Sequence, residues 1–528
     1  MNGLICLICL ATAPFAFADP IKVWVVFRDK GPGLPASGRN YEDAPLYIPY
    51  LEGLRELGFT PAVPLRWQNR ISGYIAPQDI SRLRQATGVQ SVEKMRRRKP
   101  MVRQPLPETP ESGPALPGPT AKAAAHASDT VFRALQGSLG GIGLGVLRDS
   151  LSRRGLKPGD GIRIAILDAD FALGSRGFDA IWKDGRIKDQ YDFVAGRPQA
   201  ATRGFSDSHG AEVLSIIGGD LGELLQGAAP AAEFLLYRTE NSASESWVEE
   251  DYLAAAMERA VDSGAQVVNI SLGYRYEFDD GSEFPFSELD GQTRPSSIAV
   301  LQAARRDVLV TVSIGNLPAV TTEGPTLQAP ADADSILAVG IENTQGQRCS
   351  YSCWGPTADG RIKPDIMGLA SSGCSVPQIN PFADSAVTFQ GGTSFSAPAL
   401  AGAAALLRQA FPEASAMAVR QALLRTAVLA KQPSDSSGYG LAQADLAWDM
   451  LANRQPGEKP SVMRYGPVKI AYPGDGVVWS LALKQDAPLP QGLYDLRGQW
   501  HPIRAYMDGE WVRLAPAPSL SRGLYVIP

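Results

Sequence analysis

Continuous apolar runs alternate with amphipathic helical stretches through the central part of this 528-residue chain. Runs of this kind are typical of strands that are buried on both faces of a parallel sheet, with helices covering the two faces. The predicted order is strand 162–168, helix from 209, strand 232–238, helix 247–263, strand 266–271, helix 296–305, strand 308–314 and strand 336–340. This region is therefore expected to form an α/β domain with a mostly parallel sheet.

A different pattern precedes this domain in residues 21–98. Strands are predicted at 21–27, 61–67, 72–76 and 89–92, with helices at 47–57 and 77–87. The order βαββαβ is that of a small ferredoxin-like α+β fold. Taken alone, such a module can be either a binding domain or a propeptide.

Two further segments differ in composition from the α/β domain. The basic run 94–100 leads into a stretch rich in Pro, Ala and Gly, which cannot bury a core and is predicted to be a linker over 99–130. The basic run suits either an anionic partner or a solvated, protease-accessible hinge, and the hinge is favoured. Beyond residue 456, short apolar runs alternate with Gly and Pro turns at 468–472, 477–483, 492–496, 511–514 and 524–527. They predict a short β-rich module over 456–528.

Charge and hydropathy limit the partners of the chain. The formal net charge is -5 and 44% of the residues are hydrophobic, which does not favour nucleic acid as a partner. Residues 1–18 are apolar and end in Ala16-Phe17-Ala18, a pattern typical of the cleavage site of a secretory signal peptide, although Lys and Arg are absent from this segment. No later stretch is long and apolar enough for a transmembrane anchor. The sequence predicts a protein that is secreted or periplasmic.

Cysteine usage is consistent with an oxidising compartment. After removal of the signal peptide the chain keeps Cys349, Cys353 and Cys374. One pair can form a disulfide, which leaves one thiol. If 349–353 is a strand, Cys349 and Cys353 lie about 13 Å apart and cannot bond. Cys374 is then expected to be one of the partners. Metal binding by the three thiols is the less favoured alternative.

The most informative chemistry lies in residues 390–402, where two glycines and a hydroxyl pair precede an Ala-rich apolar run. Ser394 is expected at the start of a buried helix, where free backbone N–H groups can bind a developing oxyanion. Three further polar residues follow or open predicted elements: Asp168 ends strand 162–168, His209 opens a helix and Asn316 follows strand 308–314. A lone Ser at a helix start is usually only an N-cap, but the chain order Asp, His, Ser is that of subtilisin.

Together these segments resemble the subtilases, the subtilisin-like serine peptidases, over roughly residues 135–450, and Gly392-Thr393-Ser394-Phe395-Ser396-Ala397-Pro398 is the most specific part of the resemblance. The resemblance implies a subtilisin-like three-layer fold in which Asp168 orients His209, the general base, and Ser394 is the nucleophile. It also implies that Asn316 completes the oxyanion hole. Residues Ser271, Leu272 and Gly273 match the strand along which such enzymes bind the substrate backbone.

From the resemblance we also expect protein or peptide substrates and an N-terminal propeptide that inhibits the enzyme until it is cut. The expected organisation is signal peptide 1–18, propeptide 19–98, linker with the maturation site 99–130, peptidase domain 131–455 and C-terminal module 456–528.

Three positions depart from the family pattern. Asp170 stands where Gly is usual and can either perturb His209 or point to solvent. Ala211 replaces a usual Thr, and Leu317-Pro318 follow Asn316 in place of a small or acidic residue and Gly. Because no departure removes a catalytic group, a secreted endopeptidase made as a zymogen is favoured over a catalytically weak binding or surface protein of the same fold.

Other motifs are less specific. The segment Gly392 to Ser396 is not G-x-S-x-G, which disfavours a lipase-type hydrolase. The glycines at 137–145 do not have the spacing of a dinucleotide site and precede the strand. A loop with Glu277, Asp279, Asp280 and Glu283 can bind calcium, but a solvated acidic loop is favoured. The cluster of Glu240, Glu245, Glu249 and Glu250 is interpreted as surface charge at a helix start.

Overall fold

The computed structural model describes residues 19–34, 37–95, 139, 141–206, 208–222, 224–276, 278–279, 281–316, 324–371 and 373–452, together with short strands between 479 and 526. The chain divides into two compact units, Met1–Pro100 and Met101–Pro528. No helix among the described residues is long and apolar enough to cross a membrane.

The first unit contains a four-stranded antiparallel sheet in the order β2-β3-β1-β4. Val23, Val25 and Phe27 alternate along β1 and are buried in its core, so one face of this strand covers the core. The elements are β1 (Ile21–Phe27), α1 (Arg39–Asp43), α2 (Ile48–Glu56), β2 (Thr60–Leu65), β3 (Arg70–Ile75), the 3-10 turn η1 (Pro77–Asp79), α3 (Ile80–Arg84) and β4 (Val89–Lys94). The predicted βαββαβ order is confirmed, with the short α1 added.

The second unit is built on a seven-stranded sheet in the order β13-β12-β11-β10-β5-β9-β7, in which every neighbouring pair is parallel. The strands are β5 (Arg163–Asp168), β7 (Ile187–Asp192), β9 (Glu233–Arg238), β10 (Val267–Ile270), β11 (Leu309–Ser313), β12 (Leu337–Glu342) and β13 (Ile366–Leu369). The predicted α/β fold with a mostly parallel sheet is confirmed. The strand order reverses at β5, because β9 lies on one side of it and β10 on the other, and such a point is where open α/β sheets place their sites.

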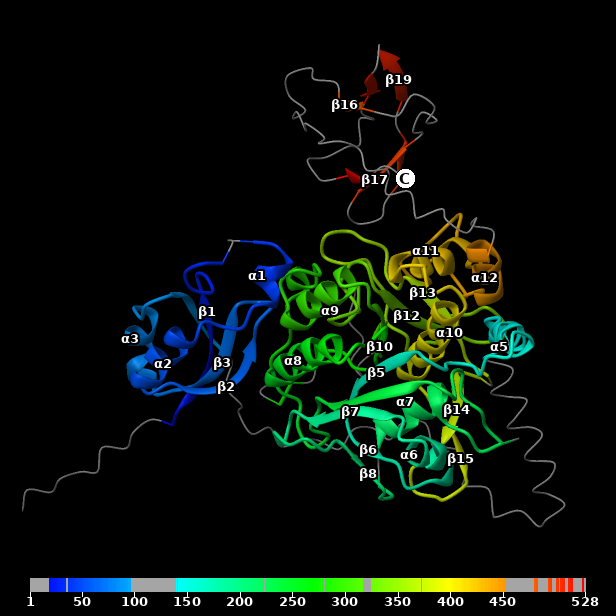
Figure 1. Ribbon diagram of the computed structural model, residues 1–528, viewed down its shortest axis with the longest axis horizontal. Helices are drawn as coiled ribbons and strands as arrows, with labels where there is room; N and C mark the ends of the chain where they lie inside the picture. Colours follow the sequence, from blue (N-terminus) through cyan, green and yellow to red (C-terminus); the bar gives the residue numbers. More distant parts are fainter. Residues whose placement is uncertain are drawn as a thin grey trace, which may run out of the picture. The chain divides into compact units, whose positions relative to one another are not determined.

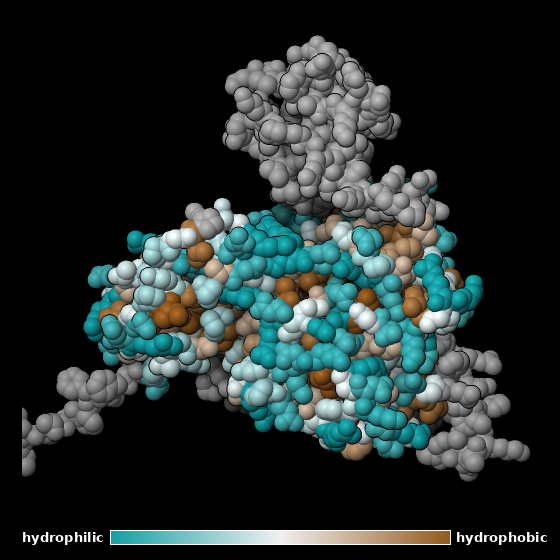
Figure 2. Space-filling model, viewed as in Figure 1, coloured by the Kyte–Doolittle hydropathy of each residue, from teal (hydrophilic) through white to brown (hydrophobic). Residues whose placement is uncertain are grey.

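Helices cover both faces of this sheet. Figure 1 shows α8 and α9 packed side by side on one face, and α10 and α11 together on the other. The helices are α5 (Leu144–Arg153), α6 (Asp179–Lys183), α7 (His209–Gly218), α8 (Val248–Asp262), α9 (Pro295–Arg305), α10 (Ala397–Ala410), α11 (Ala416–Thr426) and α12 (Ala444–Ala452). The core around α10 is made of Ala and Leu side chains, and the small alanines let this helix pass close to β10 and β11. The face in Figure 2 is mostly hydrophilic, with separate small apolar patches.

Short elements complete the second unit. They are β6 (Phe171–Ala172), which pairs with β8 (Ala201–Thr202), the hairpin of β14 (Ser375–Ile379) and β15 (Val387–Gly391), and the 3-10 turns η2 (Arg176–Phe178), η3 (Phe286–Glu288) and η4 (Thr393–Phe395). The C-terminal strands are β16 (Trp479–Ala482), β17 (Gly492–Asp495), β18 (Trp500–Pro502), β19 (Arg504–Asp508), β20 (Trp511–Ala515) and β21 (Tyr525–Val526). They form two three-stranded antiparallel sheets, as the β-rich prediction requires. The strand predicted at 468–472 lies outside the described residues.

A disulfide joins Cys349 to Cys374, whose Cα atoms lie 5.8 Å apart. Cys353 is a free, buried thiol, and burial raises its pKa to about 11. The expectation that Cys374 is one partner and that Cys349 does not pair with Cys353 is therefore confirmed.

Candidate active site

Asp168 and His209 are in direct side-chain contact at the end of β5. The Asp168 side chain is fully buried, and its Oδ1 lies 2.6 Å from Nδ1 of His209. The backbone N–H of Ala169 donates to the same oxygen at 2.8 Å. The carboxylate is thus fixed from two directions and orients the imidazole, one third of which is exposed.

The start of α7 places His209 above this carboxylate. Ser208, just before the helix, donates from its hydroxyl to the Asp170 carbonyl and accepts the N–H of Ala172 at 2.8 Å. At Gly210 an added Cβ would lie 2.9 Å from both the Asp170 carbonyl oxygen and the Phe171 ring. Only glycine permits this approach, so the His-Gly pair holds the helix start against the segment that follows β5.

Ser394 lies in the 3-10 turn η4 and not in the helix, which begins only at Ala397. The expectation that this Ser opens the helix is wrong by three residues, because Gly392 at φ 145° turns the chain before the helix can start. Pro398 is in the first turn of α10, as predicted. The Ser394 residue is 8% exposed. The ring centroid of its neighbour Phe395 lies 5.5 Å from that of His209, so the imidazole lies beside the turn that carries Ser394.

Two reciprocal hydrogen bonds join Ser394 to Ser271, the residue that follows β10. The Ser394 hydroxyl donates to the Ser271 carbonyl at 3.0 Å, and the Ser271 hydroxyl donates to the Ser394 carbonyl at 2.8 Å. Further along, a Cβ on Gly273 would lie 2.3 Å from Oε1 of Gln328. The backbone of the predicted substrate-binding segment Ser271, Leu272 and Gly273 therefore begins directly beside Ser394.

Asn316 reaches the same place from the end of β11. Its side-chain oxygen accepts the backbone N–H of Thr393 at 3.0 Å and the Thr393 hydroxyl at 3.1 Å. Since the oxygen is used in this way, the amide nitrogen is the atom left to act as a donor. That nitrogen lies 3.7 Å from where a Cβ on Gly392 would be, next to the turn that carries Ser394.

Asp170, the first departure from the family pattern, is paired with a cation. Its carboxylate lies 2.7 Å from Nε of Arg238, which also contacts Asp192 at 3.2 Å. The Ser242 hydroxyl donates to Asp170 at 3.1 Å. This side chain is 38% exposed, and its negative charge is compensated by the guanidinium rather than directed at His209.

The acidic cluster beside α8 is not surface charge, and the earlier interpretation is wrong for three of its members. Glu240, Glu249 and Glu250 are buried. Burial, together with Glu249 and Glu245 nearby, raises the pKa of Glu240 well above its usual range, and burial raises the pKa of Glu249 to about 7. Ligand atoms of Glu240, Glu245 and Glu249 lie within 4.8 Å of one another. In the acidic loop considered for calcium, Glu277 and Asp280 lie outside the described residues, so the choice between a calcium site and a solvated loop stays open.

The model of the subtilase family matches residues 159–441, which contain all of these side chains. The chain belongs to the subtilase family. Subtilisin Savinase of Lederbergia lenta is 28% identical to it over 294 residues, which cover 56% of this chain and 93% of that protein. The alkaline protease of Shouchella clausii is 28% identical over 294 residues, with 66% of its length covered.

A solved structure extends the likeness of this subtilase beyond the matched region. Fervidolysin from Fervidobacterium pennivorans, a keratinolytic enzyme related to subtilisin, has a TM-score of 0.55 at 18% identity, covering 94% of this chain and 67% of that one. At this identity the likeness shows the fold alone. The family and its subtilisin relatives show that this subtilase is a serine protease, a hydrolase that acts on proteins.

The sequence motifs did not indicate several contacts that position the site. Besides Thr393 and Phe395, a pair between Glu212 and Gln390 links α7 to β15, with the Gln390 amide donating to the carboxylate at 2.5 Å. Glu212 is 4% exposed. The sequence did offer one signal. Glu212 is a carboxylate on an otherwise apolar helix, three residues after His209, and a buried charge of this kind requires a polar partner.

Proposed function

We propose that this subtilase is a secreted serine endopeptidase that hydrolyses peptide bonds with Asp168, His209 and Ser394 and is made as a zymogen. The observation that supports it best is the convergence of four chain-distant residues, Asn316 included, around one turn. The 2.6 Å contact between Asp168 and Nδ1 of His209 leaves Nε2 as the atom that can take a proton from Ser394.

In this mechanism the Ser394 hydroxyl leaves the Ser271 carbonyl and turns to Nε2 of His209. The change is a rotation about one side-chain bond between staggered positions, and nucleophile–base contacts are often loose before substrate binds. Ser394 Oγ then attacks the scissile carbonyl carbon while its proton passes to His209. The imidazolium, stabilised by Asp168, returns that proton to the leaving amine, and water repeats the cycle on the acyl-enzyme.

The Asn316 amide and the backbone N–H of Ser394 are proposed to bind the oxyanion of each tetrahedral intermediate. The amide is preorganised because its oxygen is held by Thr393, and a donor that needs no reorganisation stabilises the transition state most. The backbone of Ser271, Leu272 and Gly273 is proposed to hold the substrate chain beside Ser394.

The domain organisation is also part of the proposal: a signal peptide at 1–18, an inhibitory propeptide at 19–98, a linker at 99–130, a peptidase domain at 131–455 and a β-rich module at 456–528. The antiparallel unit with its own core, Val23 to Val92, supports an independently folding propeptide. No metal is required by the proposed chemistry.

Labelling with a fluorophosphonate probe tests the nucleophile. We expect the purified protein to be labelled at Ser394 and to hydrolyse casein. Ser394→Ala should lose both, whereas Ser396→Ala, a matched change two residues away, should keep the label. His209→Ala should keep its fold but react at least about 100-fold more slowly, since it lacks the general base. A folded wild-type protein that neither reacts nor cleaves would favour the alternative, a subtilisin-like fold used as a binding or surface protein.

A further inference from the structure

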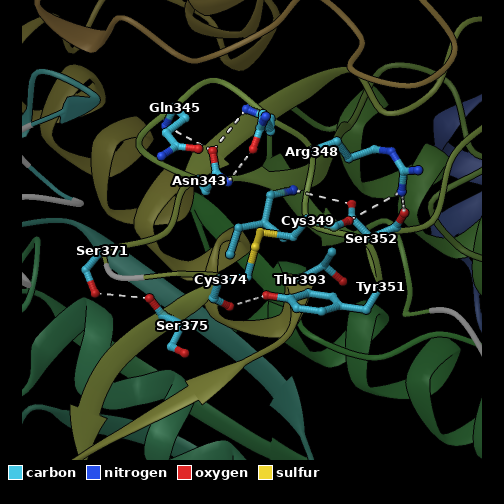
Figure 3. The surroundings of a disulfide bond; sticks show 12 residues. Asn343, Gln345, Arg348, Cys349, Tyr351, Ser352, Ser371, Cys374, Ser375 and Thr393 are labelled. Atoms are coloured by element: carbon cyan, nitrogen blue, oxygen red, sulfur yellow. Dashed lines mark hydrogen bonds between the residues drawn. A yellow bond between two sulfur atoms is a disulfide. The ribbon is translucent and has the colours of Figure 1, made fainter. Parts of the chain in front are cut away.

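The disulfide Cys349–Cys374 connects two loops that meet behind the proposed oxyanion hole. Cys349 begins the loop 349–354 that follows β12, and Cys374 immediately precedes β14, 25 residues further along the chain. Figure 3 shows the two sulfur atoms between these loops, with the Tyr351 hydroxyl directed at the Cys374 carbonyl. Cys349 is 1% exposed and Cys374 is partly buried.

One end of this cross-link is held against the segment that carries Asn316. The backbone of Ser352 pairs with that of Asn316 in an antiparallel bridge. The N–H of Cys353 donates to the carbonyl of Gly315 at 3.1 Å. The loop 349–354 therefore lies directly beside the residue proposed to bind the oxyanion.

The other end is held against the strand that leads to Ser394. In the β14–β15 hairpin Ser375 is opposite Gly391, the last residue of β15. Cys374 therefore lies beside the end of β15, two residues before the turn η4 begins at Thr393. An added Cβ on Gly391 would lie 3.2 Å from the Cys374 carbonyl oxygen and 3.2 Å from the Tyr351 ring. Glycine therefore lets the end of β15 approach these groups closely, and the pairing of Ser375 with Gly391 couples this strand end to the residue that follows Cys374.

Tyr351 joins the same two segments without a covalent bond. Its hydroxyl donates to the Cys374 carbonyl. The backbone N–H of Gly392 interacts with the same hydroxyl, although burial dominates and raises the Tyr351 pKa. This single side chain thus touches both the cross-link and the glycine that turns the chain toward Ser394.

The contacts close a ring. Asn316 pairs with Ser352, the disulfide leads to Cys374 and β15, and Thr393 returns to the Asn316 side chain through two hydrogen bonds. We infer that the Cys349–Cys374 disulfide and Tyr351 are positioning elements that hold the Ser394 turn and the Asn316 amide in catalytic register. The inference rests on the roles proposed above for Ser394 and Asn316. It predicts that full activity requires the oxidised cysteine pair.

The disulfide should affect kcat because binding of the oxyanion depends strongly on the distance between that oxygen and its hydrogen-bond donors. Binding of the substrate chain depends on these distances far less. The amide and the Ser394 N–H must meet an oxygen that acquires its charge only in the transition state. A misplacement of about 1 Å can cost on the order of 100-fold in rate without weakening the ground-state complex. Loss of the cross-link should therefore lower kcat and leave KM nearly unchanged.

The double variant Cys349→Ser/Cys374→Ser tests this in the full chain. Active sites are titrated with fluorophosphonate, and kcat and KM are measured with a peptide substrate well below the unfolding temperature. We expect kcat per titrated site to fall about tenfold with KM changed less than about twofold. Cys353→Ser is the matched control, since it removes a buried thiol from the same loop and should keep wild-type kcat. If kcat per site equals that of wild type while only the melting temperature falls, the positioning role is overturned.

Tyr351→Phe tests the inference even if the double variant does not fold, because it keeps the disulfide and removes only the hydroxyl. We expect kcat and the rate of fluorophosphonate labelling to fall together, by about threefold, at unchanged KM. Unchanged rates would overturn the role of Tyr351. Failure of the proposed function would look different, because the wild-type protein itself would then not be labelled at Ser394.

Discussion

Two carboxylates, Asp168 and Asp170, stand within two residues of each other at the end of β5, and the structure gives them different partners. Asp168 is buried and contacts the imidazole of His209. Asp170 is partly exposed and contacts the guanidinium of Arg238. An exposed carboxylate that is paired with a cation and screened by salt has little influence on a neighbouring titration. At the scale of the residue, the departure from the family pattern is thus locally compensated.

Replacement of the paired carboxylate tests this compensation. We expect Asp170→Asn to keep kcat/KM within about threefold of the wild-type value. The acidic limb of its profile of kcat/KM against pH should move by less than about 0.5 pH units. Arg238→Gln is the opposite variant, since it leaves Asp170 without its cation, whereas Asp192 keeps Arg197 at 3.4 Å. It should raise the apparent pKa of that limb, because uncompensated negative charge favours the imidazolium. If the acidic limb of Asp170→Asn moves by about one pH unit or more, Asp170 acts on His209 directly.

Asn316 offers a graded test of the oxyanion hole. Asn316→Ala should lower kcat by about 100- to 1,000-fold at nearly constant KM, which is the loss known for one such donor in a subtilisin and corresponds to roughly 3–4 kcal/mol of barrier. Thr393→Ala removes one of the two bonds to the Asn316 oxygen and keeps the backbone N–H. It should therefore cost less, about tenfold or below. Steady-state kinetics on a peptide substrate measure both, and equal losses would contradict the assigned donor.

At the scale of the element, the start of α8 shows how local sequence can mislead. Acidic residues in a first helical turn are usually exposed and interact with the helix dipole, but here the preceding loop folds back over them. The backbone N–H groups of Asn241 and Ser246 both donate to Glu249, and the Tyr274 hydroxyl donates to Glu240. Glu250 is buried against Arg294. The partners lie in loops and in other elements, so no helical periodicity could reveal them.

Burial of Glu249 predicts a dependence of stability on pH. Its pKa is about 7 in the folded protein against an ordinary 4.5, so the folded state binds more protons than the unfolded chain between these values. The unfolding free energy therefore falls as pH rises from about 4.5 to 7, by at most roughly 3 kcal/mol from this group. Glu249→Gln should flatten the fall, since the amide keeps an acceptor and does not ionise. Guanidinium denaturation at pH 5, 6, 7 and 8 gives the unfolding free energy of the wild-type protein and of the variant at each pH. If this free energy depends on pH equally in both proteins, the prediction is contradicted.

Other elements followed closely from the sequence. The buried strands β5, β9, β10 and β11 were predicted within one or two residues, because their apolar runs end at polar or turn residues. The edge strand β7 was missed, since Ile187–Asp192 is half-buried and carries Lys, Asp and Gln. The β14–β15 hairpin was also missed, because exposed residues of β15 show no apolar run. Motif spacing indicated Asp168, His209, Ser394 and Asn316 as the candidate site residues. The positions of Phe395, Tyr351 and the Glu212–Gln390 pair beside them depend on contacts between distant segments.

At the scale of the whole molecule, two compact units are separated near residue 100. The first has a closed hydrophobic core of its own, and its last strand, β4, ends at Lys94. The subtilase match begins only at residue 159. Between them lies the basic and Pro-rich sequence that was predicted to be a linker. A protease that processes itself needs an accessible segment at such a boundary, because a cut inside either core would destroy the unit.

We therefore expect maturation to cut the chain within residues 95–130. The wild-type protein should yield a mature N-terminus in that range, determined by N-terminal sequencing, and casein hydrolysis should appear in step with the cut. The full-length Ser394→Ala chain should remain intact on its own, and addition of a catalytic amount of wild-type enzyme should cut it at the same position. Processing of the isolated Ser394→Ala chain would indicate a different protease. An active mature protein whose N-terminus lies before residue 90 would show that the antiparallel unit is retained, which would assign it to the working enzyme rather than to a propeptide.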